Sequence, residues 1–289
     1  MRPDDWHLTE DVDEFLGRAG EFLRSRPALH TTQLSVTEKL RTLGAAAYEG
    51  RFPVFGRLER GGEVEATFYR FPSRGMNVTS LTPEQADSLA ARLTAMDWAL
   101  PSITADEDTI AAFTEAWQRR TGATAASRVR LHLYRLGTLT PPDPHPEGRG
   151  RLVGEEDQEH LMQWCREFAA DVEEDVTIDA ATWANTRFAE KHYTYWEAPG
   201  GTLVSMAGVN PMVAGMARVD PVYTPAHLRG RGYGAAVTTE VSRAALNAGA
   251  TDVVLYTNAA NPTSNALYQR LGYVRLTDIA VHDFTYATS

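Results

Sequence analysis

The chain has 289 residues, and at ~150 residues per domain this length favours two domains. Hydrophobic residues make up 43% and charged residues 23%, the balance of a soluble globular protein. The formal net charge of -10 argues against a protein that mainly neutralises nucleic-acid phosphates, and it favours a cationic or neutral small substrate. A single cysteine, Cys165, excludes an internal disulfide and any cysteine-based metal framework. We therefore expect no metal.

The N-terminal segment is polar and acidic, with no apolar stretch of the kind that a secretory signal has. No run of residues approaches the ~18 consecutive apolar residues that a membrane span needs. The sequence therefore predicts a cytoplasmic protein that binds neither membranes nor nucleic acids.

The clearest break in the chain is the segment 140–150, which holds four prolines and two glycines. Such a segment cannot continue a helix or a central strand, and its prolines favour an extended linker. We therefore predict an N-terminal domain at 1–140, a linker at 141–150 and a second domain at 151–289.

In the first half, apolar periodicity and turn residues predict helices and strands in alternation. Helices are expected over 11–26 and 36–48, a hairpin over 54–58 and 64–71, a strand over 77–81, helices from 82 and over 106–120, and a strand over 128–136.

In the second half, the same signals predict two helices, three strands, a helix, a strand, a helix and a last strand. The expected ranges are 155–168, 179–191, 192–196, 202–209, 216–224, 233–248, 253–256, 262–271 and 279–286. The first half has a similar order, so we interpret the chain as a duplicated domain.

The most informative segment runs from Val222 to Ala235, where a strand leads through a glycine-rich loop into a helix. Gly230, Gly232, Gly234 and Ala235 leave the backbone open to a ligand. The first N–H groups of the helix and its dipole favour a phosphate, and Arg229 and Arg231 add positive charge. The segment is therefore predicted to cradle a pyrophosphate.

A nicotinamide dinucleotide is a weaker alternative for this cradle. Gly230, Gly232 and Ala235 fit the spacing G-x-G-x-x-G/A, but five residues, Pro225 to Arg229, separate the strand from the first glycine. The next strand also ends in Tyr256-Thr257-Asn258, where a dinucleotide site needs an acidic residue. There is no G-x-x-x-x-G-K-[ST] sequence, which excludes a P-loop.

Two motifs resemble those of the GNAT acetyltransferase superfamily. Arg229-x-x-Gly232-x-Gly234 is similar to its acyl-CoA signature R/Q-x-x-G-x-G/A. The segment Asn261 to Tyr273 resembles its second motif, N-x-x-A-x-x-L-Y-x-x-x-G-[FY], with Ser264 in place of the usual alanine. The resemblance covers about residues 150–289, and the first half has the strand–helix order of the family without the cradle motif.

The resemblance implies an α/β (α+β) fold of two GNAT-like domains, each with a mixed, mostly antiparallel sheet flanked by helices. The N-terminal domain would be degenerate, as in the tandem acetyltransferases of actinobacteria. Acetyl-CoA would be the acyl donor, bound by the cradle and by Val222, Tyr223 and Thr224 on the splayed strand before it. Residues 230–235, including Tyr233, would bind the phosphates.

The resemblance also implies catalytic roles. The backbone N–H near Val222 would stabilise the oxyanion, Tyr268 would bind near the thiol and protonate the departing thiolate, and Asn261 would bind the pantetheine or cap the helix that follows it.

The general base is the open point. Many relatives have a glutamate where this sequence has Arg218, and Asp220 projects from the same face of the strand. Asp220 is therefore a candidate base or ammonium ligand, with a salt bridge to Arg218 as the alternative. His192, Tyr193, Tyr195 and His282 are candidates for the wall of the acceptor pocket.

The resulting hypothesis is an enzyme, an acetyl-CoA-dependent N-acetyltransferase that acetylates a primary amine of a small metabolite or natural product in a ternary complex. It would act as a monomer or homodimer. The alternatives are acetylation of a protein or peptide N-terminus, amide formation like that of mycothiol synthase, and a CoA-binding regulatory module without turnover.

Overall fold

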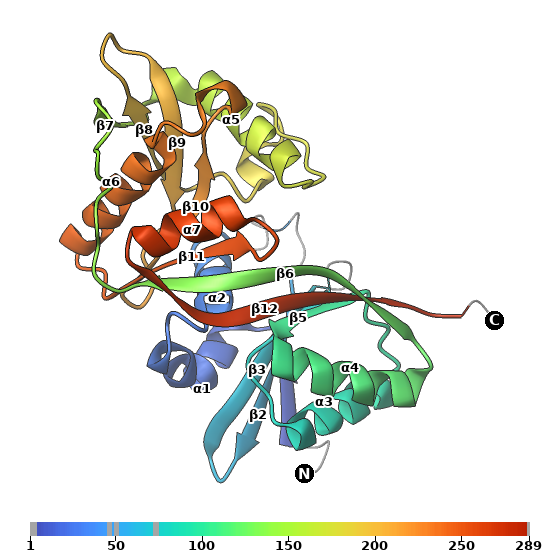
Figure 1. Cartoon of the computed structure of the whole chain (residues 1–289). Coiled ribbons are helices and arrows are strands. Elements are labelled where there is room, and N and C mark those ends of the chain that lie inside the picture. The colour runs from blue at the N-terminus through green and yellow to red at the C-terminus, as the bar shows by residue number, and fades with distance from the viewer. Residues whose placement is uncertain (1–4, 45–47, 49–51, 72–74, 288–289) are drawn as a thin grey trace. The chain divides into compact units, whose positions relative to one another are not determined.

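The computed structural model describes residues 5–44, 48, 52–71 and 75–287, and contacts within the chain divide it into two compact units. Unit 1 comprises Met1–Leu133, Asn258–Ala260 and Leu276–Ser289, and unit 2 comprises Tyr134–Thr257 and Asn261–Arg275. This division differs from the predicted boundaries. Residues 134–140 and the proline-rich segment lie within unit 2, and residues 258–260 and 276–289 belong to unit 1. Figure 1 shows the elements of both units.

Unit 1 is built from a mostly antiparallel sheet and helices. Its elements are β1 (Trp6–Thr9), α1 (Val12–Ser25), α2 (Thr31–Leu43), β2 (Val54–Arg60), β3 (Glu63–Phe71), β4 (Gly75–Val78), α3 (Pro83–Ala95), β5 (Ser102–Asp106), α4 (Glu107–Thr121), most of β6 (Thr124–Leu136) and the end of β12 (Tyr273–Thr285). Neighbouring strands from β1 to β4 are antiparallel, β4 and β5 are parallel, and β5 pairs antiparallel with β12.

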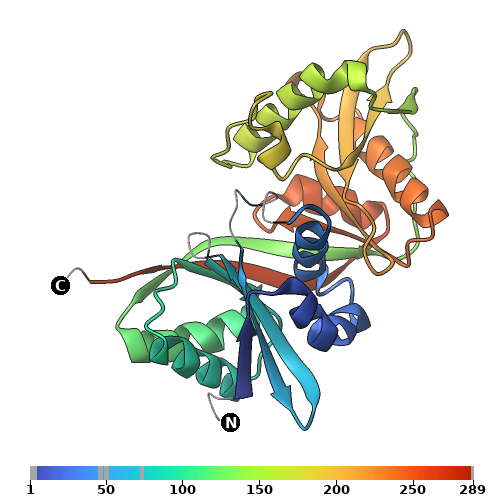
Figure 2. The same cartoon turned by 180° about the vertical axis from the view of Figure 1, so that it is seen from behind.

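The helices of unit 1 cover both faces of this sheet (Figures 1 and 2). On one face, Phe15 of α1 stacks on Phe55 of β2 with ring centroids 4.6 Å apart. On the other face, Leu58 of β2 lies in a core cluster with Leu89 of α3 and Phe113 of α4. The two sides of β2 are apolar because successive side chains of a strand point to opposite faces.

Unit 2 contains β7 (Arg149–Leu152), α5 (Gln158–Asp171), β8 (His192–Glu197), β9 (Leu203–Val209), β10 (Met216–Tyr223), α6 (Tyr233–Asn247), β11 (Asp252–Asn258) and α7 (Pro262–Arg270). Strands β7 to β10 form an antiparallel meander, and β11 pairs parallel with β10. Both units therefore have the predicted mixed, mostly antiparallel sheet flanked by helices.

The sheet of unit 2 separates two cores, with α6 on one face and α5 on the other (Figure 1). Trp196 of β8 packs in the core beneath α6, whereas Tyr193 and Tyr195 of the same strand pack in the core beneath α5. Cys165 of α5 is fully buried in this second core, as expected for a small apolar side chain.

The predicted helix over 179–191 is wrong. The segment forms only a short 3-10 turn at Trp183–Asn185. The N–H groups of Ala181 and Thr182 donate to the Asp179 carboxylate at 2.9 Å each. The N–H and the hydroxyl of Thr186 both bond to the carbonyl of Trp183, which in an α-helix would accept from the N–H of Arg187.

Other boundaries also differ from the prediction. The helix predicted over 36–48 is α2, which begins at Thr31 and ends at Leu43, and residues 45–47 of that prediction lie outside the described residues. Its first turns carry buried polar side chains such as Gln33 and Thr37, so apolar periodicity could not reveal them. The strands β1, β5 and β7 were not predicted, because segments of four or five residues are too short to show a clear alternation of apolar and polar side chains.

Candidate functional site

The loop between β10 and α6 exposes backbone N–H groups at a helix N-terminus. Gly230 and Gly232 have φ angles of 77° and 82°, in the left-handed region that glycine adopts with least strain. Gly232 is the N-cap of α6, and no side chain of the described residues caps this helix. The first N–H groups, from Tyr233 to Ala235, are therefore open to an anion, which the helix dipole also favours.

The two arginines of this loop differ in their contacts. Arg229 donates from Nε to the carbonyl of Thr224 at 2.9 Å, and its Nη2 is paired with Asp171 at the end of α5. Arg231 makes a longer hydrogen bond, 3.4 Å from Nη2 to the carbonyl of His227. Arg229 thus shapes the loop, while the charge of Arg231 is less committed to the protein.

Strands β10 and β11 pair over only three residues. Met216–Arg218 lie in parallel register with Asp252–Val254, whereas β10 continues against β9 as far as Tyr223, which pairs with Met206. Within the described chain, the edge of β10 that faces β11 therefore has no ladder partner beyond Arg218. Such an edge can accept an extended ligand as an added strand.

The predicted strand residues Val222, Tyr223 and Thr224 lie at this unpaired edge. Val222 packs against the core beneath α6, and the Tyr223 side chain is buried beneath α5, where its hydroxyl donates to Glu167 at 2.6 Å. The hydroxyls of Thr224 and Ser205 lie 2.8 Å apart. These side chains are engaged within the protein, so a ligand here would meet their backbone.

The strand β10 has a bulge beside this edge. Val219 pairs with Val209 and Val222 pairs with Ala207, so Asp220 and Pro221 together lie opposite Gly208. A bulge of this kind bends the strand and turns its backbone groups out of the ladder. Pro221 suits this position, because it has no N–H to give to a strand ladder.

Helix α7 carries the remaining two predicted residues. Asn261 is its N-cap, with the side-chain oxygen accepting from the N–H of Ser264 at 3.1 Å, so its capping role is present. Tyr268 is 9% exposed, and its ring lies edge-on to that of Tyr273 at 6.0 Å between centroids. Burial raises the pKa of Tyr268, and the negative charge of Asp220 adds to the effect.

The hydroxyl of Tyr268 differs from those of the other buried tyrosines of unit 2. Its hydroxyl makes no hydrogen bond to the described residues and is not among their buried, unpaired polar atoms, so the ring is buried while the hydroxyl is open to solvent. The hydroxyl of Tyr193 donates to the carbonyl of Phe188 at 2.8 Å, and that of Tyr273 lies 2.7 Å from Ser242 Oγ. Tyr268 therefore keeps a free donor near the charge of Asp220.

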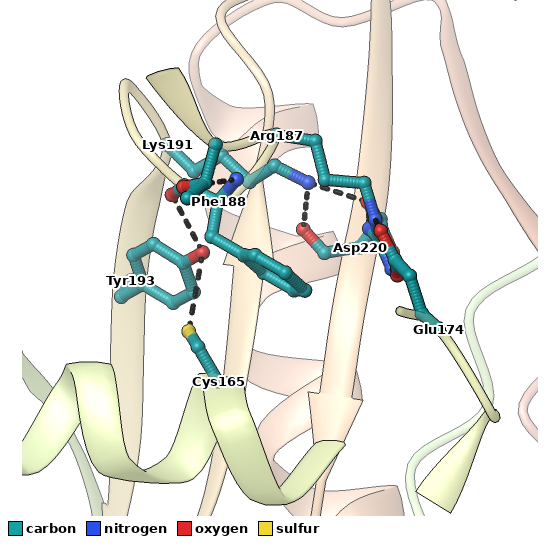
Figure 3. A network of polar contacts seen from close by, with 8 residues as sticks. Cys165, Glu174, Arg187, Phe188, Lys191, Tyr193 and Asp220 are labelled. Atoms are coloured by element: carbon teal, nitrogen blue, oxygen red, sulfur yellow. Dashed lines mark hydrogen bonds and ion pairs between the residues drawn. The ribbon is translucent and has the colours of Figure 1, made fainter. Parts of the chain in front are cut away.

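Asp220 lies in a cluster of charged side chains on the α5 side of the sheet, shown in Figure 3. Its carboxylate accepts from Arg187 Nη1 at 2.6 Å and is paired with Lys191 Nζ. Arg187 is held in turn by the carboxylate of Glu174, 2.7 Å from Nη2. Although burial opposes it, the charges of Lys191, Arg187 and Arg218 hold the pKa of Asp220 well below its usual range.

A carboxylate held in this way is a weak proton acceptor, because a general base works best with a pKa near the operating pH. The geometry therefore argues against Asp220 as the base and favours the ion-pair alternative. The pairing partners are Arg187 and Lys191, where the sequence suggested Arg218.

The sequence model of the acetyltransferase (GNAT) family matches residues 156–273. This segment is a GNAT domain. It contains the cradle, the bulged strand and Tyr268, and it lies almost wholly within unit 2. No curated protein sequence matches the chain.

Solved structures with a similar fold span the whole chain. One is a tandem GNAT protein from the clavulanic acid biosynthesis pathway, with 15% identity, a TM-score of 0.59, and coverage of 98% of this chain and 99% of that one. A GCN5-related N-acetyltransferase from Sphaerobacter thermophilus has 15% identity and a TM-score of 0.57 over 98% and 96% of the two chains. A Drosophila protein has 15% identity and a TM-score of 0.62 over 97% and 98%. At these identities the likeness is one of fold, and it includes the N-terminal half.

The N-terminal GNAT-like unit lacks an open cradle at the corresponding helix. Helix α3 is closed by a capping box, in which Thr82 accepts from the N–H of Gln85 at 3.3 Å and the Gln85 side chain accepts from the N–H of Thr82 at 2.9 Å. The N–H of Leu81, just before it, donates to the Thr109 hydroxyl at 2.8 Å. The groups that would bind a phosphate are thus satisfied internally.

The candidates for the acceptor wall are spread over both units. Tyr193 and Tyr195 are buried with their hydroxyls engaged, that of Tyr195 3.0 Å from His160 Nδ1. His192 is exposed. His282 belongs to unit 1, where its Nδ1 lies 3.2 Å from the Thr114 hydroxyl.

Lys191 and Arg187 were not predicted as site residues, because their segment was predicted to form a helix. The Lys191 side chain is only 4% exposed, and burial lowers its pKa to about 8 against the opposing effect of Asp220. The sequence does single out Lys191. The chain has only two lysines, Lys39 and Lys191, among 28 basic residues, and Lys191 directly precedes the aromatic-rich strand β8.

Proposed function

We propose that the GNAT domain of unit 2 is an acetyl-CoA-dependent N-acetyltransferase. It would transfer the acetyl group to a primary amine of a small metabolite or natural product, by direct attack within a ternary complex. The N-terminal unit would bind no acyl donor.

The observation that carries this proposal is the free hydroxyl of buried Tyr268 in a domain that also has an uncapped, glycine-rich helix start. Because the Tyr268 ring is buried while its hydroxyl is open to solvent and makes no internal hydrogen bond, the hydroxyl is held in place and available to a ligand. The open N–H groups at the start of α6 suit the phosphate end of a ligand such as acetyl-CoA, and the Tyr268 hydroxyl on α7 suits its thiol end.

Each part of the chain has a role in the proposed reaction. The backbone of Gly230, Gly232, Gly234 and Ala235, with the charge of Arg231, would hold the pyrophosphate of the donor. The backbone N–H in the region of Val222 would stabilise the negative charge on the thioester oxygen as the amine attacks. The new C–N bond forms as the C–S bond breaks.

Tyr268 would give its proton to the sulfur as the bond breaks and would regain one from solvent. Asn261 would add a polar contact to the pantetheine arm beside its capping role. With Asp220 held in ion pairs, the amine would lose its proton to water.

The test is thiol release from acetyl-CoA in the presence of a panel of amines, with mass spectrometry of the products. Acetylation of a small amine supports the proposal. Turnover restricted to peptide N-termini would assign the domain to protein acetylation. Tight binding of acetyl-CoA with no release on any amine would indicate a CoA-binding module without turnover.

A further inference from the structure

The carbonyl of Asp220 leaves the strand ladder at the bulge in β10. An ideal Cβ built on Gly208, which pairs with Tyr193 of β8, would lie 2.8 Å from this oxygen. Because a Cβ in a strand stands out from the sheet, the oxygen must lie over the face of the sheet beside Gly208. A carbonyl in that position needs a donor other than a strand N–H.

Lys191 supplies the donor. It lies directly before β8, and its side chain reaches across β9 so that Nζ lies 2.9 Å from the Asp220 carbonyl (Figure 3). The same Nζ is paired with the Asp220 carboxylate. One ammonium group therefore binds both the backbone and the side chain of the bulged residue.

The surrounding charges keep the lysine in this position. The Asp220 carboxylate is shared with Arg187 Nη1 at 2.6 Å, and Arg187 is fixed by Glu174 through two 2.9 Å contacts from Nε. The Lys191 side chain is 4% exposed, which leaves Nζ little freedom to reach a substrate. Its contacts are those of a group that holds the backbone.

We propose that Lys191 is a positioning residue that clamps the β10 bulge through the main-chain carbonyl of Asp220, and so fixes the backbone at Val222 against the thioester of the acyl donor. This inference rests on the proposed function, because it assigns the bulge to the donor carbonyl. The side-chain oxygen of Asp220 is a second acceptor for the same ammonium group, and the clamp depends on the main-chain carbonyl.

The test compares the binding of acetyl-CoA and of CoA by calorimetry in the full-length protein. CoA shares the cradle contacts but has no thioester carbonyl. In Lys191→Met, a variant of similar length, Asp220 keeps its partner Arg187 and the fold is expected to survive. We expect its preference for acetyl-CoA over CoA to fall about fivefold, the effect of about one neutral hydrogen bond, with CoA affinity within about twofold of the wild type.

Asp220→Asn is the matched variant, since it keeps the main-chain carbonyl and a side-chain acceptor. We expect it to retain the wild-type preference within about twofold. An equal loss in Asp220→Asn and Lys191→Met would assign the effect to the carboxylate and overturn the proposal. An unchanged preference in a folded Lys191→Met would overturn it as well.

Gly208→Ala tests the same carbonyl if Lys191→Met does not fold. The added methyl must displace the Asp220 oxygen, the Tyr193 ring at 2.8 Å or Pro221 at 3.1 Å. We expect the same selective loss for acetyl-CoA, whereas Gly17→Ala, at a position with no heavy atom within 4 Å, is the control. Retention of the preference in Gly208→Ala would contradict the clamp. If the wild type bound neither ligand, the proposed function itself would fail, which is a different result.

Discussion

Arg229 is bound to the carbonyl of Thr224, 2.9 Å from Nε, so the loop that begins at Thr224 is closed by a side chain five residues further on. The other end of the guanidinium is paired with Asp171 of α5. The loop thus keeps its shape without a ligand. In this shape the N–H groups of the first turn of α6 are open to a ligand. Arg229 is paired with Asp171, whereas the guanidinium of Arg231 bonds only to a carbonyl, at 3.4 Å, among the described residues.

The two arginines should therefore affect donor binding in different ways. We expect Arg231→Ala to weaken acetyl-CoA binding about tenfold or more, since a charge-assisted contact contributes ~1.5–3 kcal/mol, and the effect should shrink at high salt. Arg229→Ala should also weaken binding at least tenfold through the loop, with little change in salt dependence. Calorimetry at two salt concentrations checks both, with Arg243→Ala on α6 as a charge-matched control. Equal affinity in all three variants would contradict the assignment.

Removal of the Tyr268 hydroxyl should slow the chemical step with little effect on stability. The hydroxyl has no partner in the described chain, so Tyr268→Phe removes no internal hydrogen bond. We expect kcat to fall ten-fold or more, toward the ~10²–10⁴-fold that general acid catalysis typically contributes, while KM for acetyl-CoA stays nearly constant.

Tyr273→Phe is the control for Tyr268→Phe. Its hydroxyl is bonded to Ser242 Oγ at 2.7 Å, so its loss should cost about 1 kcal/mol of stability and leave kcat unchanged. An unchanged kcat in Tyr268→Phe, under conditions where chemistry limits the rate, would make Tyr268 a core aromatic.

The capping box on α3 predicts how many donor molecules the chain binds. Because a capping box of Thr82 and Gln85 closes the start of α3, the helix that corresponds to α6, we expect calorimetry to give one CoA per chain. A stoichiometry of two would reveal a second site in unit 1.

The buried lysine predicts a pH dependence of stability. The pKa of Lys191 falls from 10.5 to about 8 in the folded chain, so between these values the unfolded chain binds more protons. The contribution of Lys191 is therefore fully favourable above pH 10.5, and it is lost as the pH falls through 8. Relative to Lys191→Met, the wild type should gain unfolding free energy over this interval, by at most about 1.4 kcal/mol per pH unit. Urea unfolding at several pH values measures the difference, and a gap that does not change with pH would contradict the shifted pKa.

The local features of the site could be read from the sequence because they depend on residues close together in the chain. Gly230 and Gly232 require a turn whatever surrounds them, and Asn261-Pro262 marks a helix start in any fold. The order of strands and helices, and the likeness of the two halves, follow from periodicity in the same way.

The positions that the sequence analysis placed wrongly depend on contacts between distant segments. Residues 179–191 have a helical pattern, but the segment forms only a short 3-10 turn and instead brings Lys191 to the bulge. The partners of Asp220 are 33 and 29 residues away in sequence, so only tertiary structure could identify them.

The sequence by itself therefore determined the glycine turn before α6, the α7 cap and the family of the domain, since each depends on residues close together in the chain. Tertiary structure decided which charges meet at Asp220, which tyrosine hydroxyl stays without a partner, and that the last strand enters unit 1. The physical reason is that ionisation and hydrogen bonding in a buried site depend on every group that excludes water from it, and those groups come together only when the chain folds.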